Sequence, residues 1–327
     1  MRTESLRSSL LSLPLLAAAV LGTGGMDLPA QAGAPGASAS GQKATYLFSP
    51  KLWHDDSEVL APGFLRGLRG FDHFYDPIGQ PIYFESPFND SGVRLLYLHH
   101  EFDNRSPLQG GELDIYAVQA RLALTERLGF IATKDGYSEI DTGLLGSESG
   151  WNDIAFGFKY VALYDREEDL VVTPGIRYQA ENGSRDVLQG GFEEISPFVS
   201  IAKGWGKLHA VGNATWRIPF DSDANQVLHY DAHIDYEVAD GFAPVAELHG
   251  VSYLTDGNVT PLNVGGLDYT NLGSTDVAGS TVLWLGLGAR AKFNPHTSLG
   301  FTYEFALTDS QDDIMDTRYT IDFILKW

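Results

Sequence analysis

The feature that most constrains the fold is a strict alternation of apolar and polar residues, repeated in many segments along the chain. In one such segment, Phe156, Phe158 and Tyr160 alternate with Gly157 and Lys159. Successive side chains of a β-strand point to opposite faces, whereas a helix would bring residues three or four apart onto one face. One face of each segment must therefore meet an apolar environment and the other a polar one.

About twelve segments show this pattern, and an even strand number is expected for a closed single-chain bacterial barrel. They lie near residues 92–102, 112–124, 127–137, 151–164, 168–182, 191–203, 206–218, 226–238, 241–254, 278–293, 297–307 and 317–327. The sequence therefore predicts an all-β fold, a transmembrane antiparallel up-and-down β-barrel of about 12 strands over residues 91–327, with an irregular N-terminal segment.

The connections between these segments alternate in length. Those near 125–127, 203–207, 239–241 and 294–296 are tight, whereas those near 138–150, 183–190, 219–225, 255–277 and 308–316 are mostly longer and richer in Gly, Asp and Ser. Short periplasmic turns and long external loops are the rule for outer-membrane barrels. A secreted β-sandwich, the alternative, would bury its apolar faces against each other and would not need this alternation.

The carboxyl-terminal segment is apolar at every second position and ends on an aromatic residue. The apolar positions are Tyr319, Ile321, Phe323, Leu325 and Trp327. This pattern resembles the last strand of outer-membrane barrels, so we predict that these residues form the membrane-insertion signal. The partners expected from it are outer-membrane lipids, lipopolysaccharide and the barrel-assembly machinery.

The amino terminus has the form of a secretory signal peptide. Arg2 and Arg7 precede an apolar run over residues 10–21, and Ala30 and Ala32 form a small-x-small cleavage site. The run is shorter than the roughly 20 residues of a spanning helix. We therefore predict a signal peptide over residues 1–32 and localisation in the outer membrane of a Gram-negative-type cell.

Composition excludes two classes of function. The 43 acidic and 22 basic residues give a net charge of −21, which argues against nucleic acid as a partner because phosphate binding needs a basic surface. The sequence holds no cysteine, so disulfides and thiol chemistry are excluded. No cofactor is predicted.

Residues 33–90 are the least regular part of the mature chain. A Gly/Ala/Ser linker over 33–42 precedes aromatic residues such as Phe71, Tyr83 and Phe84, which stand among Pro and Gly without a strand period. So much aromatic surface is not expected to stay in water. We predict a plug in the lumen, a cover on the periplasmic mouth or an assembly surface, and these three alternatives remain open.

A short motif adds a family resemblance. Residues 151–160 contain the pattern D-x-x-x-G-x-K-Y from Asp153, which is similar to a strand of the MetA-pathway phenol-degradation family of outer-membrane proteins. Val118–Thr125 and Phe130–Gly136 resemble neighbouring strands of such proteins. The resemblance implies a transporter, and aromatic compounds as its solutes.

The polar faces of the strands carry charges of both signs, and we predict that they line a pore. These residues are Lys159, Arg177, Arg217, His229, Asp231, His233, Asp235, Glu237, Glu247, His249, Arg290, Glu304 and Arg318. Charged rings set the selectivity of pores, and the acidic row of residues 229–237 predicts a preference for cations. A narrow barrel filled by ion pairs is the alternative, because side chains or a plug can close a lumen of this strand number.

Two chemical sites are alternatives to this interpretation. The histidines and carboxylates of residues 229–249 suit zinc, but strand residues two apart lie about 7 Å from each other, and ion pairing explains the same pattern. His296 and Ser298 have the spacing found in outer-membrane lipid hydrolases. They lie at a predicted tight turn without a third orienting group, so neither a metal site nor an enzyme is predicted.

The sequence thus predicts an outer-membrane pore for small solutes, including apolar or aromatic compounds. A structural or adhesion barrel with a filled lumen is the main alternative, and a lipid hydrolase is the lesser one.

Overall fold

The computed structural model describes residues 44–47, 65–309 and 314–327, so the predicted signal peptide and linker lie outside the described residues. The described elements are β1 (Gly92–Phe102), β2 (Gly111–Ala123), β3 (Leu128–Lys134), β4 (Tyr137–Thr142), β5 (Gly146–Trp151), β6 (Ala155–Tyr160), β7 (Leu163–Asp165), β8 (Leu170–Gln179), the 3-10 helix η1 (Arg185–Val187), β9 (Glu194–Trp205), β10 (Leu208–Pro219), β11 (Val227–Tyr236), β12 (Phe242–Tyr253), β13 (Thr281–Asn294), β14 (Thr297–Ala306) and β15 (Met315–Lys326).

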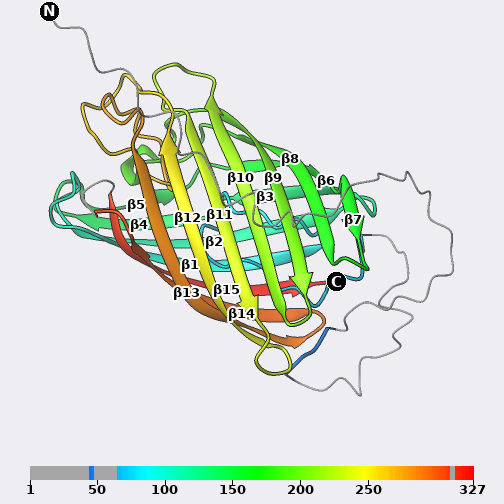
Figure 1. Ribbon diagram of the computed structural model, residues 1–327. Helices are drawn as coiled ribbons and strands as arrows, with labels where there is room; N and C mark the ends of the chain where they lie inside the picture. Colours follow the sequence, from blue (N-terminus) through cyan, green and yellow to red (C-terminus); the bar gives the residue numbers. More distant parts are fainter. Residues whose placement is uncertain (1–43, 48–64, 310–313) are drawn as a thin grey trace, which may run out of the picture. The chain divides into compact units, whose positions relative to one another are not determined.

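Twelve of these strands form one closed antiparallel ring (Figure 1). Around the ring they follow the order β1, β2, β3, β6, β8, β9, β10, β11, β12, β13, β14 and β15, and β15 pairs with β1 to close it. The closing register runs from Gly92 opposite Lys326 to His100 opposite Arg318. None of the helical turns in the described part of the chain has the length and apolarity to cross a membrane. The predicted barrel of about twelve antiparallel strands is therefore confirmed.

The prediction of a loop over residues 138–150 is wrong, because this segment forms the hairpin of β4 and β5. β3 is shorter than predicted and pairs with β2 only from Ala120 to Ala123. The outer part of β2, Gly111 to Tyr116, pairs instead with β4. Backbone groups need hydrogen-bond partners, so the hairpin extends the wall where β3 ends.

The segment predicted as one strand over residues 151–164 is interrupted. β6 ends at Tyr160, and the next two residues bond to different neighbours. Val161 donates its N–H to the carbonyl of Arg127, and Ala162 donates to the carbonyl of Val172. The wall therefore continues through an irregular step into β7.

The outer face of the ring is apolar, as the alternation predicted. Exposed side chains on it include Leu95, Val118, Phe156, Phe158, Ile176, Val199, Ile234, Leu287, Leu299, Phe301, Ile321 and Leu325. Exposed aromatic residues stand where the strands end, with Tyr160, Trp205, Tyr236 and Trp327 at the end that carries the short turns, and Trp151 and Trp216 toward the end that carries the long loops. An apolar band between two aromatic girdles is the surface that a lipid bilayer requires of a barrel.

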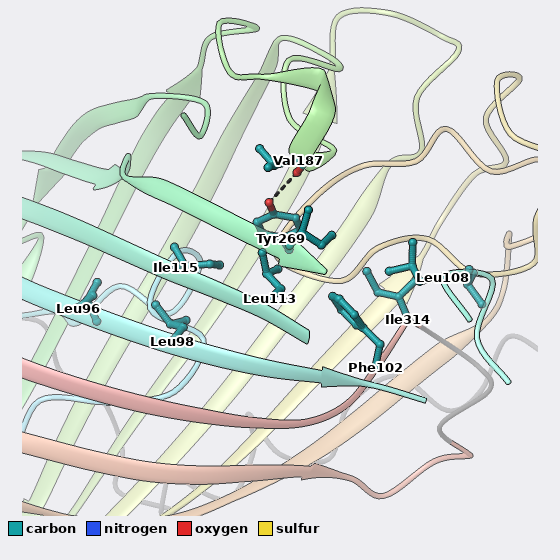
Figure 2. Packing of buried hydrophobic residues seen from close by; sticks show 11 residues of the cluster. Leu96, Leu98, Phe102, Leu108, Leu113, Ile115, Val187, Tyr269 and Ile314 are labelled. Atoms are coloured by element: carbon teal, nitrogen blue, oxygen red, sulfur yellow. Dashed lines mark hydrogen bonds between the residues drawn. The ribbon is translucent and has the colours of Figure 1, made fainter. Parts of the chain in front are cut away.

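The interior holds apolar clusters at both ends of the barrel. At the short-turn end, Phe71, Phe74 and Phe88 pack against Val161 and Val171. Figure 2 shows the cluster at the long-loop end. There, the connection predicted to lie outside over residues 255–277 is partly folded inward.

Tyr269 is the residue through which this connection packs inside the barrel (Figure 2). It packs beside Leu113 and Ile115 of β2, and its hydroxyl donates a 2.6 Å hydrogen bond to the carbonyl of Val187. Val264 of the same connection belongs to the same cluster. Burial of these apolar side chains favours the inward position over an external loop.

The lipid-facing assignment can be tested at Phe158. Replacing Phe158 by Arg places a charge on the exposed apolar face of β6, which costs about 2 to 4 kcal/mol near the bilayer midplane of a barrel. We expect a reduced yield of heat-modifiable folded protein in outer membranes. Leu144→Arg, at an exposed position in the turn between β4 and β5, is the control and should fold normally. Equal yields of the two variants would contradict the assignment.

The terminal aromatic residue can be tested separately. The main chain of Trp327 is held by a hydrogen bond to the carbonyl of Ser91, while its side chain remains exposed. Trp327→Asp should therefore keep barrel closure but lose the interfacial aromatic ring, and we expect slower assembly in a time course of heat-modifiability. Trp151→Asp, at the opposite end, controls for loss of an exposed tryptophan; a slowing of both variants alike would show that the chain end has no special role.

Candidate functional site

The lumen of the barrel is the candidate functional site. Every predicted pore-lining residue is buried on the inner face of the ring, with exposed fractions from 0% to 7%: Lys159, Arg177, Arg217, His229, Asp231, His233, Asp235, Glu237, Glu247, His249, Arg290, Glu304 and Arg318. This follows from the alternation, since the neighbours of these residues along each strand point outward and form the apolar band. Whether the residues line a conducting pore is a separate question, because the lumen is not empty.

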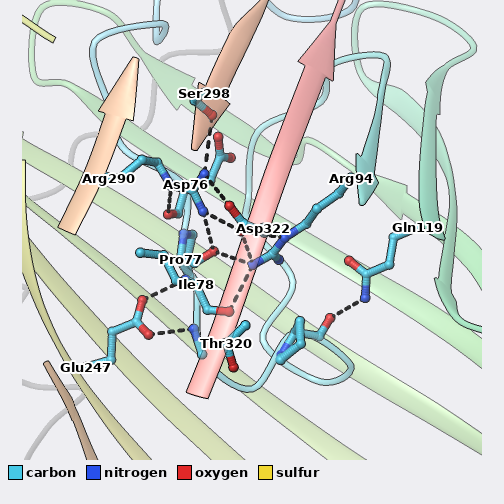
Figure 3. Close-up of polar contacts among 12 residues, drawn as sticks. Asp76, Pro77, Ile78, Arg94, Gln119, Glu247, Arg290, Ser298, Thr320 and Asp322 are labelled. Carbon is cyan, nitrogen blue, oxygen red and sulfur yellow. Dashed lines mark hydrogen bonds and ion pairs between the residues drawn. The ribbon is translucent and has the colours of Figure 1, made fainter. Parts of the chain in front are cut away.

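Residues 65–91, called the N-terminal plug below, lie inside the ring. Figure 3 shows Pro77 and Ile78 of the plug between Glu247 and Arg94 of the wall. The N–H groups of Ile78 and Gly79 donate to the Glu247 carboxylate of β12 at 2.8 and 2.6 Å. Arg94 of β1 donates to the carbonyl of Ile78 at 2.9 Å, and Thr173 of β8 to that of Pro87 at 2.6 Å. The described part of this segment therefore contacts inward side chains of β1, β8 and β12.

Inward basic side chains hold the plug by its main chain. Lys159 donates to the carbonyl of Phe88 at 2.6 Å, and Arg177 donates to that of Ile82. Lys292 donates to the carbonyl of Phe74 at 2.6 Å. Hydrogen bonds from charged donors are stronger than neutral ones, so carbonyl acceptors meet part of the hydrogen-bonding need of these buried cations.

Glu85 binds the plug to the wall through two ion pairs. Its carboxylate accepts from Arg121 Nη2 and from Lys159 Nζ, each at 2.7 Å, and its side chain is only 2% exposed. Burial alone would raise the pKa of Glu85, but the two cations outweigh burial and lower it to about 2. Glu85 is therefore ionised across the physiological pH range and ties the plug to β2 and β6.

A second ion-paired group joins the strands next to the closure of the ring (Figure 3). Asp322 of β15 accepts from Arg94 Nε of β1 at 2.7 Å and from Arg290 Nη2 of β13 at 2.6 Å. Arg290 also donates to the carbonyl of Asp76 at 2.8 Å. The same cations thus join the wall to itself and to the plug.

The histidine and carboxylate row pairs within itself. His209 Nδ1 lies 2.6 Å from Asp235, His233 Nδ1 lies 2.7 Å from Glu247, and His249 Nδ1 lies 2.8 Å from Asp231. Among the described residues, no three or more metal-ligating side chains are arranged to hold a metal ion. Each of these three imidazoles thus contacts one carboxylate through Nδ1, and the Nε2 atoms of His209 and His249 are buried without a hydrogen bond.

A second inserted piece, residues 264–270, enters from the long-loop end and is called the outer insert. Arg318 Nη1 donates to Asp268 Oδ2 at 2.8 Å, and Arg217 Nη1 donates to the carbonyl of Leu267 at 3.0 Å. Lys134 Nζ lies 3.2 Å from the carbonyl of Tyr269. The inward cations therefore bind inserted segments from both ends of the barrel.

His296 and Ser298, which have the spacing found in lipid hydrolases, bind two different partners. His296 Nδ1 lies 2.9 Å from the carbonyl of Lys326, in the turn between β13 and β14. Ser298 Oγ accepts a 3.2 Å hydrogen bond from Arg290 Nη1. Each side chain thus has a structural role.

Sequence reasoning missed several lumen residues. Arg94, Arg121 and Lys292 stand on inward strand positions, and the alternation alone could have found them. Glu85 and Asp268 lie in irregular segments, and their place in the lumen depends on long-range contacts that no local pattern records.

Comparison with a solved channel structure supports the same fold. An outer membrane channel from Pseudomonas putida F1 shares 15% identity and a TM-score of 0.50, over 78% of this chain and 100% of that one. The NanC porin shares 10% identity and a TM-score of 0.44, over 72% of this chain and 100% of that one. At 15% identity, the likeness to the Pseudomonas putida channel concerns the fold alone. A search of curated protein sequences found no match to this chain.

The sequence itself matches one family model. The match runs over residues 84–317, from the middle of the plug to the start of the last strand, and so covers most of the chain. It also includes the D-x-x-x-G-x-K-Y motif on which the resemblance rested. The chain belongs to the family described as "Putative MetA-pathway of phenol degradation".

Proposed function

We propose that the chain is an outer-membrane channel for small solutes, that aromatic compounds are among them, and that the N-terminal plug closes its lumen. The observation that carries this proposal is the nature of the contacts in the middle of the lumen. There the plug is held by hydrogen bonds and ion pairs, as at Glu85 and Glu247. Water can replace such contacts when the plug moves, because it solvates the same donors and charges.

The wall supports this proposal because it is charged at mid-barrel. Arg177, Arg217, Asp231 and Glu247 come from four different strands and are all buried. Burying so many charges is costly unless each is paired, and apolar side chains of similar size fill a permanently closed core at lower cost. A charged lining suits a lumen that admits water and solute for part of the time.

The aromatic preference has two supports. The family description refers to phenol degradation. In addition, the lumen binds aromatic rings of the plug through cations of the wall, since Lys292 Nζ lies 4.0 Å from the ring centroid of Tyr75. Cations over the face of a ring attract its π-electrons, and this interaction strengthens where water is excluded.

Export and assembly follow from the same proposal. Residues 1–32 would direct the chain through the secretory pathway, and the last strand would be recognised during insertion. The apolar belt would contact outer-membrane lipids, and the long-loop end would contact lipopolysaccharide. A filled structural barrel is the second candidate, and the apolar clusters at both ends of the lumen favour it.

Gly79 provides a test of the channel against the filled barrel. A Cβ atom added at Gly79 would lie 2.7 Å from His249 Nε2 and 2.8 Å from Glu247 Oε2, so a larger side chain cannot seat there without displacing charged groups. Gly79→Val should therefore loosen the plug. We expect more frequent and larger conductance steps in planar bilayers than for the unchanged protein.

The matched control is Gly191→Val, because a Cβ at Gly191 meets no atom closer than 3.7 Å. This variant should conduct like the unchanged protein, and heat-modifiability should show that both variants are folded. A folded Gly79→Val protein without conductance, together with an equally silent variant lacking residues 65–90, would favour the filled structural barrel.

A further inference from the structure

Tyr83 of the plug occupies a slot built by the barrel wall. Its side chain is almost fully buried, with 1% exposed. Arg177 Cζ lies 4.3 Å and Arg217 Cζ lies 4.8 Å from the centroid of its ring. The ring of His229 stacks on it with 4.3 Å between centroids and 11° between planes. The slot thus surrounds one aromatic ring with two guanidinium groups and a parallel imidazole.

The slot also recognises the hydroxyl group. Tyr83 Oη donates a 2.9 Å hydrogen bond to Glu194 Oε1. The carboxylate is held in place by Arg217 Nε, at 2.9 and 3.0 Å from its two oxygens. Burial raises the pKa of the Tyr83 hydroxyl, so it remains protonated and can donate. The contacts therefore match each part of a phenol, the ring face and the O–H.

The side chains that build the slot belong to the wall, and three of them also have partners on the wall. Arg177, Glu194, Arg217 and His229 stand on β8, β9, β10 and β11, four consecutive strands of the ring. Arg217 binds Glu194, and Arg177 Nη1 donates to Thr133 Oγ1 at 3.1 Å. These contacts lie within the wall, so they hold Arg177, Glu194 and Arg217 near the slot when another ring replaces that of Tyr83.

The plug presents Tyr83 from an irregular turn. Tyr83 and Phe84 both donate their N–H groups to the carbonyl of Gln80, and Gln80 has a positive φ of 49°. Residues other than glycine seldom adopt this conformation, which costs free energy. Thr215 of β10 supports the turn by donating to the carbonyl of Tyr83 at 3.1 Å. The ring is thus delivered into the slot by a strained segment.

We propose that the slot of Arg177, Glu194, Arg217 and His229 is a binding site for free phenolic solutes, and that Tyr83 occupies it as a tethered competitor while the lumen is closed. The inference rests on the proposed function and names the solute class. An aliphatic alcohol lacks the π-face that the two guanidinium groups contact. An aromatic carboxylate would bring a second negative charge next to Glu194, whereas a phenol donates a hydrogen bond to it.

Tyr83→Ala tests the competition directly, with phenol as the probe. Removing the ring empties the slot, so phenol should bind the folded full-length mature variant about tenfold more tightly than the unchanged protein, because no tethered ring competes. Isothermal titration calorimetry in detergent measures the binding, with protein-free detergent as the reference. Cyclohexanol, similar in size but without a π-face, should bind much more weakly than phenol.

Two further variants serve as matched controls. Tyr83→Phe keeps a ring in the slot and should not gain phenol binding. Tyr164→Ala removes a similar ring at the short-turn end, where Arg127 and Arg166 lie 4.8 and 4.9 Å from its centroid and its hydroxyl donates to Glu126. It should bind phenol like the unchanged protein. Phenol binding by Tyr83→Ala that is no tighter than in these controls, or equal binding of cyclohexanol, would overturn the inference.

A second measurement uses the unchanged protein, so the test stands even where Tyr83→Ala folds poorly. Phenol that displaces Tyr83 should raise the conductance of the unchanged protein in planar bilayers, and cyclohexanol at the same concentration should not. Conductance of Gly79→Val without any effect or binding of phenol would refute the slot and leave the channel standing. Phenol binding without conductance in any variant would refute the channel and leave the slot as a binding site.

Discussion

The pairing of β15 with β1 is the contact on which the rest of the structure depends. The core of a bilayer holds no water that could form hydrogen bonds with a free strand edge. All backbone groups of the strands are therefore bonded only when the ring is closed. Closure gives every strand one face toward lipid and one toward a narrow interior. The apolar residues, such as Phe158 and Ile321, must then point outward, and the charged residues collect inside.

The charged residues inside the ring set a second constraint on the structure, since each buried cation needs a hydrogen-bond acceptor. Part of that need is met on the wall, as where Asp322 binds Arg94 and Arg290. The remainder is met by segments that enter the lumen, through carbonyl groups and through carboxylates such as Glu85 and Asp268. The plug and the outer insert are therefore part of the electrostatic balance of the barrel, and moving them requires water or solute to take over their contacts.

The sequence was sufficient for the ring and its two faces, because both depend on the alternation within each strand. It was not sufficient to predict the hairpin of β4 and β5, which pairs with β2 where the short strand β3 has ended. It was also not sufficient to predict the inward fold around Tyr269. The slot of Tyr83 joins an irregular segment to four separate strands, so no local period could indicate it. The preference for cations was predicted from residues 229–237, which form only one part of the wall. It stays a prediction.

A tethered competitor sets a quantitative condition on transport. A side chain on a short flexible tether acts at an effective concentration of about the millimolar range. Phenol of similar affinity must therefore reach about this concentration to replace Tyr83, and the remaining plug contacts raise the concentration that is needed. Those contacts are coupled through Arg177, which binds both the Tyr83 ring and the carbonyl of Ile82. Groups that share a partner do not contribute independently, so solute that enters the slot also weakens the hold on the neighbouring main chain. Binding of the solute and release of the plug are then two sides of one equilibrium.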